Sequence, residues 1–386
     1  MSPSLRSRRS DFDELPTPCL LLDRDRLDRN TRRMRKQLDR FAIPLRPHLK
    51  TAKSIEVARR VLVAPHEAAM VSTLREAEFY ASHGLRDLIY GVGIAPPKLS
   101  RVGEIRVRYC TDLTVVLDSV EQAEAVVSWS RENNQALPVL IEVDVDGHRS
   151  GVRLADSPLL IAIARKLVEG GATLRGVMTH AGASYNLQSA GDLIAAAAAE
   201  RATAVRAAEM LRAVGLACPI VSIGSTPTAS FARDLTGVTE VRAGVFMFGD
   251  LVQAGIGTCG IEDIAVSVLA TVIGHSGAQG RIMVDSGWMA LSQDRGTSRQ
   301  TIDQHYGLVC DEGCRPYPDL LVLEANQEHG TVGIRRGSAA TLPDLPIGSL
   351  VRILPNHACA TAAQHDRYHV IADATVVSQW PRVNGW

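Results

Sequence analysis

Residues 43–54, Ile-Pro-Leu-Arg-Pro-His-Leu-Lys-Thr-Ala-Lys-Ser, join a short apolar run to the start of a helical pattern. The same order, a short apolar run followed by a longer helical segment, recurs up to about residue 250. Several runs are continuous Val, Ile and Leu stretches, as expected of strands that are buried on both faces. The expected strands cover residues 43–47, 69–72, 87–90, 113–117, 139–145, 174–180, 220–223 and 240–245.

Helix-period patterns lie between these strands, for example at residues 119–133, 157–169 and 190–214, the last ending at Gly215. Eight strand-helix units within about 220 residues match the size of a closed (β/α)8 barrel. An open, doubly wound sheet is the structural alternative. No GxGxxG sequence follows the first strand, and the count of units reaches eight, so we predict the barrel.

The pattern changes after about residue 262, where β-rich runs alternate with Gly, Pro and Asp turns. These runs cover residues 264–272, 281–285, 320–325, 350–354 and 368–378. We therefore predict a barrel domain at residues 30–262 and a mainly β domain at residues 263–386. Residues 17–22 are also strand-like, and we expect the N-terminal segment, residues 1–29, to pack with the β domain.

The composition is that of a soluble globular protein. Of the 386 residues, 46% are apolar and 22% are charged, and 42 basic residues balance 42 acidic ones. A formal net charge of zero gives no support for a nucleic-acid partner and does not oppose a homodimer. The basic residues Arg6, Arg8 and Arg9 precede an acidic stretch rather than an apolar one, so we expect no secretory signal and no membrane segment. An odd number of widely spaced cysteines, seven, predicts reduced thiols in the cytoplasm.

Lys50 follows the first expected strand. A lysine at the carboxyl end of a barrel strand faces the mouth where such proteins keep their active sites. In a partly desolvated position, its neutral amine could attack an aldehyde. The local sequence by itself favours the alternative, a surface lysine that follows a strand. Lys53, three residues further on, is expected to lie in the following helix.

Two later loops suggest a phosphate site. Gly224-Ser225-Thr226 follows the seventh expected strand, and Arg242-Ala243-Gly244-Val245 ends the eighth. The loops after these strands are a recurrent phosphate site in (β/α)8 proteins, because small residues let backbone N–H groups approach the ligand. A tight turn followed by a Ser/Thr helix cap is the alternative for each loop.

Two further side chains lie at strand ends. His180 ends the run 174–180, where an imidazole could lie against a flat ring in the barrel mouth, although a structural histidine is the alternative. Arg149 follows the run 139–145 and could reach a cofactor, although Asp146-Gly147 around it also suits a simple turn.

His357 and Cys359 form a His-x-Cys pair. On a strand, residues two apart point to the same face, and imidazole and thiolate both suit zinc. Two ligands are fewer than the usual three of a catalytic zinc, so a buried cysteine beside a structural histidine is the alternative. Cys310 and Cys314 lack a second close pair, and we interpret them as loop thiols.

Taken in order, seven segments resemble the D-serine dehydratase and D-threonine aldolase group of pyridoxal-phosphate enzymes, which belongs to the alanine racemase fold type. The resemblance covers nearly the whole chain, from Thr17 to Trp386. The segments are residues 46–51, 146–152, 179–182, 224–228, 240–244, 326–330 and 355–361.

This resemblance implies that Lys50 carries pyridoxal 5'-phosphate as an internal aldimine and that His357 and Cys359 bind Zn²⁺ or another divalent metal. The aldolase branch usually has Asp at the position of Cys359, which favours the dehydratase branch. One departure is Phe246, where relatives often have Tyr, and it weakens the expected phosphate contact. The implied cofactor-binding residues are Lys50, Arg149, His180, Tyr185, Gly224, Ser225, Thr226, Arg242, Gly244 and Val245, and Gln327 and His329 are expected on the substrate side.

The resulting hypothesis is a lyase that removes water, and then ammonia, from a 3-hydroxy-D-amino acid such as D-serine or D-threo-3-hydroxyaspartate, with Lys50 and His180 as catalytic residues. A retro-aldol lyase that gives glycine and an aldehyde is the alternative with the same cofactor and metal. A racemase would need a second base, for which Tyr306 and Tyr368 are candidates. A carrier that only binds the cofactor would not need residues 263–386.

Overall fold

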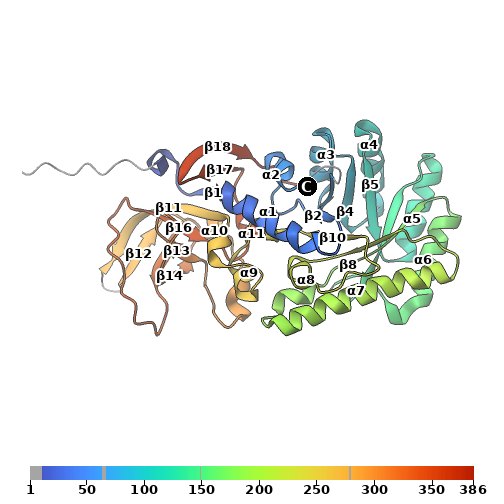
Figure 1. Ribbon diagram of the computed structural model, residues 1–386. Coiled ribbons are helices and arrows are strands. Elements are labelled where there is room, and N and C mark those ends of the chain that lie inside the picture. Colours follow the sequence, from blue (N-terminus) through green and yellow to red (C-terminus); the bar gives the residue numbers. More distant parts are fainter. Residues whose placement is uncertain (1–10, 63–66, 148, 278–279) are drawn as a thin grey trace, which may run out of the picture. The chain divides into compact units, whose positions relative to one another are not determined.

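The computed structural model describes residues 11–62, 67–147, 149–277 and 280–386, and its chain divides into two compact units (Figure 1). The first unit comprises the described residues up to Leu27 together with Phe248–Gly255 and Gly260–Arg382. The second comprises Asp28–Met247, Ile256–Cys259 and Val383–Trp386. Arg6, Arg8 and Arg9, and His148 within the segment 146–152, lie outside the described residues.

The second unit contains a barrel of eight parallel strands, with the short β7 (Val152–Arg153) paired at the side of β6. Neighbouring strands follow the order β2-β10-β9-β8-β6-β5-β4-β3, and a parallel bridge between His48 and Met70 connects the two ends of that row. The predicted (β/α)8 barrel is thus confirmed. The strands are β2 (Leu45–Pro47), β3 (Ala68–Val71), β4 (Asp87–Gly93), β5 (Asp112–Leu117), β6 (Pro138–Asp144), β8 (Thr173–Thr179), β9 (Ile220–Ile223) and β10 (Glu240–Ala243).

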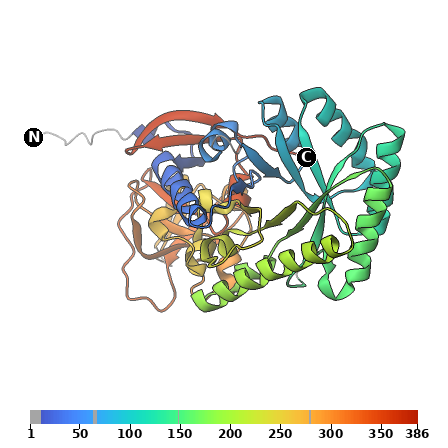
Figure 2. The same cartoon turned by 45° about the vertical axis from the view of Figure 1, so that its right-hand side comes forward.

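Helices lie on the outside of these strands (Figure 2). Serines placed just before the apolar periodicity begin two of them: the Ser119 side chain accepts the Gln122 N–H at the start of α5, and Ser189 accepts the Asp192 N–H at the start of α7. The helices are α1 (Arg24–Asp39, within which the two units meet in sequence), α2 (Ile55–Val61), α3 (Leu74–Ser82), α4 (Leu99–Tyr109), α5 (Val120–Glu132), α6 (Ser157–Glu169), α7 (Ala190–Ala213) and α8 (Thr226–Phe231), with short 3-10 turns η2 (Pro96–Lys98), η3 (Leu154–Asp156), η4 (Gly182–Asn186) and η5 (Val245–Met247).

The barrel interior is apolar in one layer and polar in the next. Six neighbouring strands each contribute one side chain to a single cluster, made of Met70, Ile89, Val116, Leu140, Met178 and Ile220. Because side chains two apart on a strand share a face, the next inward positions are occupied by Glu142 on β6, Ser222 on β9 and Arg242 on β10. Two residues further along, the next inward positions are His180 after Met178 and Gly224 after Ser222, beyond the carboxyl ends of β8 and β9.

The first unit is built on a largely antiparallel sheet with the order β12-β15-β14-β13-β16-β11-β1-β17-β18. A further pairing of β12 with β11 closes six of these strands into a ring. β1 pairs with β11 on one side and with β17 on the other, so this N-terminal strand is an interior member of the sheet. The strands are β1 (Cys19–Asp23), β11 (Val266–Ser276), β12 (Arg281–Val284), β13 (Leu308–Cys310), β14 (Pro316–Ala325), β15 (Gly330–Ile334), β16 (Leu350–Leu354), β17 (Arg367–Ala372) and β18 (Thr375–Pro381).

Three details of this unit differ from the sequence-based expectation. β13 and β15 were not expected, and the single run at 368–378 is a hairpin of β17 and β18. The hairpin turns at Asp373 and Ala374, both with positive φ. Alanine rarely adopts that conformation, so the sequence carries no turn signal there. Short helices complete the unit: η1 (Asp11–Glu14), α9 (Leu251–Ile256), η6 (Ile261–Asp263), α10 (Trp288–Leu291), η8 (Gly296–Arg299) and α11 (Ala358–Ala362).

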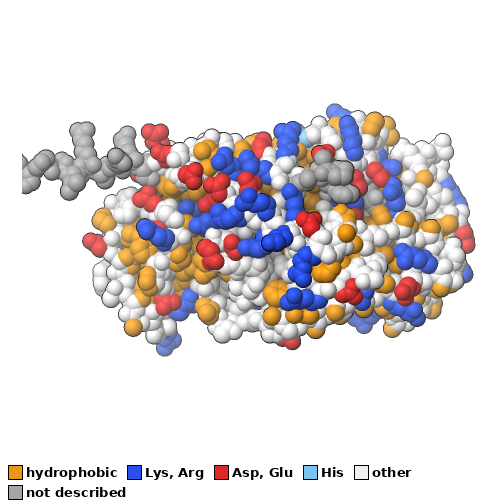
Figure 3. Space-filling view, in the orientation of Figure 1, with side chains coloured by type: hydrophobic (Ala, Val, Ile, Leu, Met, Phe, Trp, Pro, Cys, Tyr) orange, Lys and Arg blue, Asp and Glu red, His pale blue; other side chains and the backbone are white. Residues whose placement is uncertain are grey.

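Basic and acidic side chains are intermingled on the face drawn in Figure 3. This agrees with the balanced charge of the sequence. In the part of the chain that the structure describes, no helix has the length and apolar character needed to span a bilayer.

Candidate active site

Lys50 lies in the turn after β2, and its side chain is exposed. Lys53 does not lie in the following helix, as expected, but precedes it in a left-handed conformation with φ 49°. The Lys53 ammonium lies 3.3 Å from the carboxylate of Glu76, which is 1% exposed. Since Glu76 holds the amine of Lys53, Lys50 is the better candidate for an amine that binds an aldehyde.

His48 lies beside this turn. Its Nδ1 accepts the Lys50 backbone N–H at 3.4 Å, and its Nε2 lies 3.4 Å from the Ser72 hydroxyl. Burial, followed by the charges of Lys50 and Arg242, lowers the pKa of His48 well below its ordinary value. The sequence interpretation missed this residue, although its position directly after the first expected strand was a usable signal.

His180 follows β8, at the same end of the barrel. Its Nδ1 lies 3.0 Å from the carbonyl oxygen of Gly224, which can only accept, so Nδ1 carries the proton. Burial lowers the pKa of His180 to about 3, and the charges of Arg149, Arg242 and Lys50 act in the same direction. The His180 ring is therefore neutral at neutral pH.

Arg242 lies within β10, in the barrel interior, whereas His48 and His180 lie beyond the carboxyl ends of their strands. Its guanidinium donates to the Ser222 hydroxyl at 3.1 Å and to the Thr179 carbonyl. Burial lowers the pKa of Arg242, and the carboxylates of Glu200 and Glu240 oppose that shift. Its Nε has no hydrogen-bond partner among the described residues. A buried, unpaired N–H costs about 1–3 kcal/mol, so an acceptor on a bound molecule would be favourable at this position.

The hydroxyls predicted to bind phosphate have partners inside the unit. The Ser225 hydroxyl accepts the Thr228 N–H at 3.2 Å and so caps α8. The Thr226 hydroxyl accepts the N–H of Phe246 at 3.1 Å. A phosphate at these loops would therefore have to contact backbone N–H groups other than those of Thr228 and Phe246, which are already hydrogen-bonded.

Two glycines let these loops approach one another closely. A Cβ on Gly224, whose φ is 133°, would lie 2.1 Å from the Arg242 carbonyl oxygen. A Cβ on Gly244 would lie 2.9 Å from the Thr51 hydroxyl and 3.1 Å from the His48 carbonyl oxygen. Only glycine fits both positions, which bring the ends of β2, β9 and β10 together.

Arg149 and Tyr185 complete the predicted cofactor residues. Arg149 is exposed, and its charge contributes to the low pKa of His180. The Tyr185 and His180 rings have centroids 6.3 Å apart. A flat aldehyde with a phosphate group fits this set, because it offers an exposed amine, a neutral ring, an unpaired Arg N–H and glycine-lined loops at the carboxyl ends of parallel strands.

The predicted metal pair lies in the first unit, but not on a strand. His357 is the extended residue just before α11, and Cys359 is the second residue of that helix. The expectation that both face one side of a strand was therefore wrong. The helix start nevertheless brings the pair together, because the His357 imidazole is within hydrogen-bonding reach of the Cys359 thiol.

Two carboxylates, those of Asp294 and Asp250, contact the segment that carries this pair. The His357 Nδ1 lies 2.7 Å from Asp294 Oδ2. Burial disfavours a charged ring, but the hydrogen bonds with Asp294 and Cys359 raise the pKa of His357 to about 11. Asp250 is buried and accepts the backbone N–H of Ala358, between the two predicted ligands, at 2.9 Å. The sequence interpretation missed both carboxylates.

Further hydrogen bonds fix the segment that carries the pair. The Asn356 Oδ1 accepts the Thr297 hydroxyl at 2.5 Å, and the Thr361 hydroxyl donates to the Leu291 carbonyl at 2.7 Å. No group of three or more His, Cys, Asp and Glu side chains able to hold a metal occurs among the described residues. His357 and Cys359 would therefore supply two ligands, which leaves coordination positions for water or substrate.

The interpretation of Cys310 and Cys314 as loop thiols was wrong for Cys310, which ends β13, whereas Cys314 lies in the loop that follows. Both side chains are buried in one apolar cluster with Leu308 and Leu321. Arg26 donates to the Cys314 sulfur at 3.4 Å. These cysteines are core residues of the first unit.

The remaining candidates also lie in the first unit. Gln327 and His329 are exposed beside β15 and stay predictions as substrate residues. Tyr368 is fully buried, and its hydroxyl accepts the Arg382 Nε at 2.9 Å. Burial raises the pKa of Tyr368, so it is a poor candidate for the second base of a racemase.

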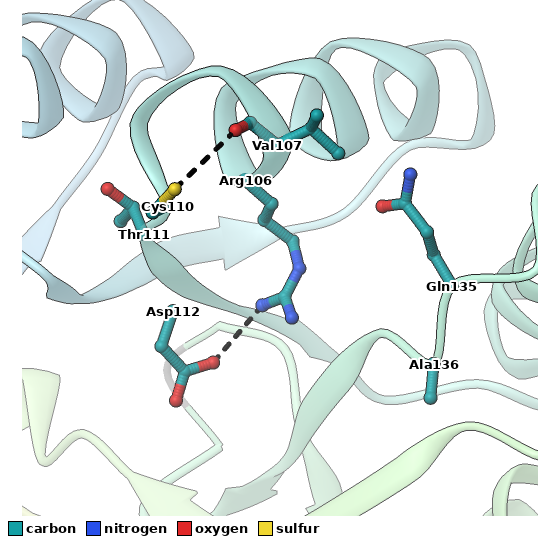
Figure 4. A pocket seen from close by; sticks show the side chains of 7 residues that line it. All are labelled: Arg106, Val107, Cys110, Thr111, Asp112, Gln135 and Ala136. Atoms are coloured by element: carbon teal, nitrogen blue, oxygen red, sulfur yellow. Dashed lines mark hydrogen bonds and ion pairs between the residues drawn. The ribbon is translucent and has the colours of Figure 1, made fainter.

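A pocket of about 450 Å³ lies at the opposite, amino-terminal edge of the barrel strands (Figure 4). Its lining includes Arg106, Cys110 and Asp112, and Arg106 donates to the Asp112 carboxylate at 3.1 Å. Because barrels of this type place their chemistry at the carboxyl ends of the strands, we do not assign the active site to this pocket.

Comparison with known proteins identifies the family. Residues 22–252 match the model of the alanine racemase N-terminal domain, and residues 265–371 match that of a putative serine dehydratase domain. The chain belongs to the D-serine dehydratase and D-threonine aldolase group of the alanine racemase fold type. The predicted family is confirmed, and membership of this family supports pyridoxal phosphate as the cofactor.

Individual relatives match over nearly their whole length. The chain is 50% identical to D-threo-3-hydroxyaspartate dehydratase of Delftia sp. (strain HT23), over 96% of this chain and 98% of that protein. The solved structure of that enzyme has a TM-score of 0.94 at 49% identity and covers 98% of this chain and 100% of its own. A D-threonine aldolase of Arthrobacter sp. is 28% identical over 94% of this chain and 91% of that protein.

Proposed function

We propose that this protein is a pyridoxal-phosphate-dependent lyase that removes water, and then ammonia, from a 3-hydroxy-D-amino acid to give a 2-oxo acid. D-threo-3-hydroxyaspartate is the first substrate to test. The observation that carries the proposal is the 50% identity to the dehydratase from Delftia, which spans both units of the chain.

Lys50 has two roles in this proposal. It would hold the cofactor aldehyde, and its free amine would remove the proton from the substrate's α-carbon. When bound, pyridoxal phosphate withdraws electrons from that carbon. The neutral His180 ring would hold the flat cofactor, and the unpaired Arg242 N–H would offer it a hydrogen bond from the barrel interior.

His357 and Cys359 would hold Zn²⁺ or another divalent ion, which supplies a Lewis acid for the poor leaving group, the β-hydroxyl. Two matching solved structures are mutants of D-threo-3-hydroxyaspartate dehydratase, one with a cysteine and one with a histidine changed to alanine. Their mutated positions are two residues apart, as His357 and Cys359 are, and the cysteine mutant is described as metal-free.

Retro-aldol cleavage is the second candidate, because aldolases of D-threonine and of 3-hydroxy-D-aspartate are also relatives. The thiol of Cys359, at a position where the resemblance leads us to expect Asp in aldolases, favours dehydration. A homodimer and a cytoplasmic location remain predictions.

A panel of D-amino acids tests the proposal: D-serine, D-threonine and D-threo-3-hydroxyaspartate, each incubated with and without a chelator. We expect ammonia and a 2-oxo acid from a hydroxylated substrate, with the loss of both after chelation. If glycine and an aldehyde are the main products, the reaction is retro-aldol cleavage and not dehydration. Exchange of the α-hydrogen with deuterated solvent, without consumption of the substrate, would indicate a racemase.

A further inference from the structure

We propose that Asp294 is the positioning residue that orients the His357 imidazole for metal binding. The inference rests on the metal site of the proposed function. The two side chains lie 63 positions apart in the sequence, and their atoms meet at 2.7 Å between His357 Nδ1 and Asp294 Oδ2. This contact is short for a nitrogen-oxygen hydrogen bond, as expected when the acceptor is a carboxylate.

The direction of the hydrogen bond fixes which ring nitrogen binds a metal. An ionised carboxylate only accepts, so Nδ1 of His357 must donate to Asp294. In the neutral ring, which is the form that binds metals, Nε2 then carries the free lone pair. The His357 ring also lies within hydrogen-bonding reach of the Cys359 side chain, so the two side chains are close enough to share one ion. The carboxylate makes the ring a stronger donor as well.

Asp294 is itself held in place. It lies in the loop after α10, where its backbone N–H donates to the Ser292 hydroxyl at 3.3 Å. Ser292 follows α10 with a positive φ, and its backbone N–H donates to the Trp288 carbonyl at 2.8 Å. The Asp294 carboxylate also accepts the backbone N–H of Gly296. An anchored carboxylate of this kind restricts the rotation of the imidazole that it binds.

The second carboxylate near the pair acts differently. Asp250 accepts the N–H of Gln253 at 2.8 Å and the N–H of Ala358 at 2.9 Å, so it connects the starts of α9 and α11. Asp250 therefore fixes the backbone between His357 and Cys359, whereas Asp294 fixes the His357 side chain. Because replacing Asp250 would disturb folding, the orientation of the His357 ring is tested at Asp294.

The experiment measures cobalt binding by the full chain after removal of metal by dialysis against a chelator. Cobalt bound to a thiolate gives a charge-transfer absorption, which reports Cys359, and competition with a chelator gives the affinity. The samples are wild type, Asp294→Ala, Asp294→Asn and the control Asp319→Asn. Asp319 is a comparably exposed carboxylate of the same unit, at 44% against 36% for Asp294, but it pairs with Arg335.

We expect Asp294→Ala to bind cobalt about 10- to 100-fold more weakly, the usual effect of losing such an outer partner. Asp294→Asn should weaken binding less, because its amide oxygen still accepts the His357 N–H but carries no charge. Both variants should regain the thiolate band at saturating cobalt, since Cys359 is intact, and Asp319→Asn should match wild type. The same ranking with zinc, measured by competition, would support the assignment.

Wild-type affinity in Asp294→Ala, with the thiolate band present, would overturn the positioning role and leave the metal site standing. No thiolate band in wild type would overturn the metal site itself, and the inference with it. Thermal unfolding of the metal-free variants separates orientation from folding. If Asp294→Ala proves unstable, Asp294→Asn, which has the same shape, decides the result: weaker binding at an unchanged melting temperature supports the role, and unchanged binding contradicts it.

Discussion

At the scale of single residues, two lysines three positions apart have different surroundings. Lys50 is exposed after β2, whereas the Lys53 ammonium neutralises the buried Glu76 carboxylate. We therefore expect Lys50→Ala to abolish the visible absorbance of the bound cofactor. Lys53→Ala should keep that absorbance but lower the free energy of unfolding by about 2 kcal/mol, because it leaves a buried carboxylate without its partner.

Absorption spectra and urea unfolding of the two variants check this assignment. An unchanged spectrum in Lys50→Ala would place the cofactor on another amine. Loss of absorbance only in Lys53→Ala would reverse the roles of the two lysines.

The low pKa of His180 predicts a dependence of stability on pH. Above the unfolded pKa of about 6.5, the ring is neutral in both states, so it contributes no pH dependence. As the pH falls from 6.5 towards the folded pKa of about 3, only the unfolded chain binds the proton, and stability is lost. At pH 5 this loss amounts to about 2 kcal/mol at 1.4 kcal/mol per pH unit.

Urea unfolding of the cofactor-free protein at pH 7.5 and pH 5 measures this loss. His180→Gln, which keeps a donor for the Gly224 carbonyl, should lose about 2 kcal/mol less than wild type over that interval. Equal losses in both proteins would mean that His180 takes up its proton in the native state.

Sequence reasoning located the residues proposed for the chemistry better than those that hold them in place. Lys50, His180 and Arg242 lie at or near the ends of strands whose apolar runs were visible, so their shared barrel end followed from the fold. Asp294 and Asp250 lie far from His357 in the sequence, and no local pattern marks them. Their roles depend on contacts that only the folded chain makes.

At the scale of secondary-structure elements, β1 is the feature with the largest consequence for stability. It lies between β11 and β17, and Leu21 on it is fully buried in a cluster with Leu269 and Ile371. Leu21→Ala should lower the free energy of unfolding by about 3 kcal/mol. Val377→Ala on the edge strand β18, where the side chain is 46% exposed, should cost about 0.5 kcal/mol.

Chemical denaturation of both variants tests this contrast. Similar, small losses for the two would mean that β1 is not an integral strand of its sheet, because a core strand does not tolerate a cavity of that size.

Elements with strong periodicity were predictable, and elements defined by their partners were not. The helix expected at 157–169 is α6, and the one expected at 190–214 is α7, because each repeats its apolar residues over several turns. β13 has three residues, and β15 contains Gly330 and Gly333, so neither has a strand pattern of its own. The pairing of β13 with β16 and of β15 with β12 places them in the sheet.

At the scale of the whole molecule, the predicted functional groups belong to different units. Lys50, His180 and Arg242 lie in the barrel unit, and His357, Cys359 and Asp294 in the β unit. Each set is held by hydrogen bonds within its own unit, which the sequence order of the motifs did not reveal. Loss of the metal is therefore expected to leave the residues that hold the cofactor unchanged.

Cys359→Ala tests this separation. The variant should lose bound metal and the elimination of water, while it keeps the cofactor absorbance, because His48, His180 and Arg242 make hydrogen bonds with other residues of the barrel unit. Metal content, absorption spectrum and ammonia release are measured on the same sample, with Cys110→Ala, an exposed thiol of the barrel unit, as the control. Full ammonia release by a metal-free Cys359→Ala protein would remove the metal from the reaction. Loss of the cofactor absorbance together with the metal would show that the two sets of residues depend on one another.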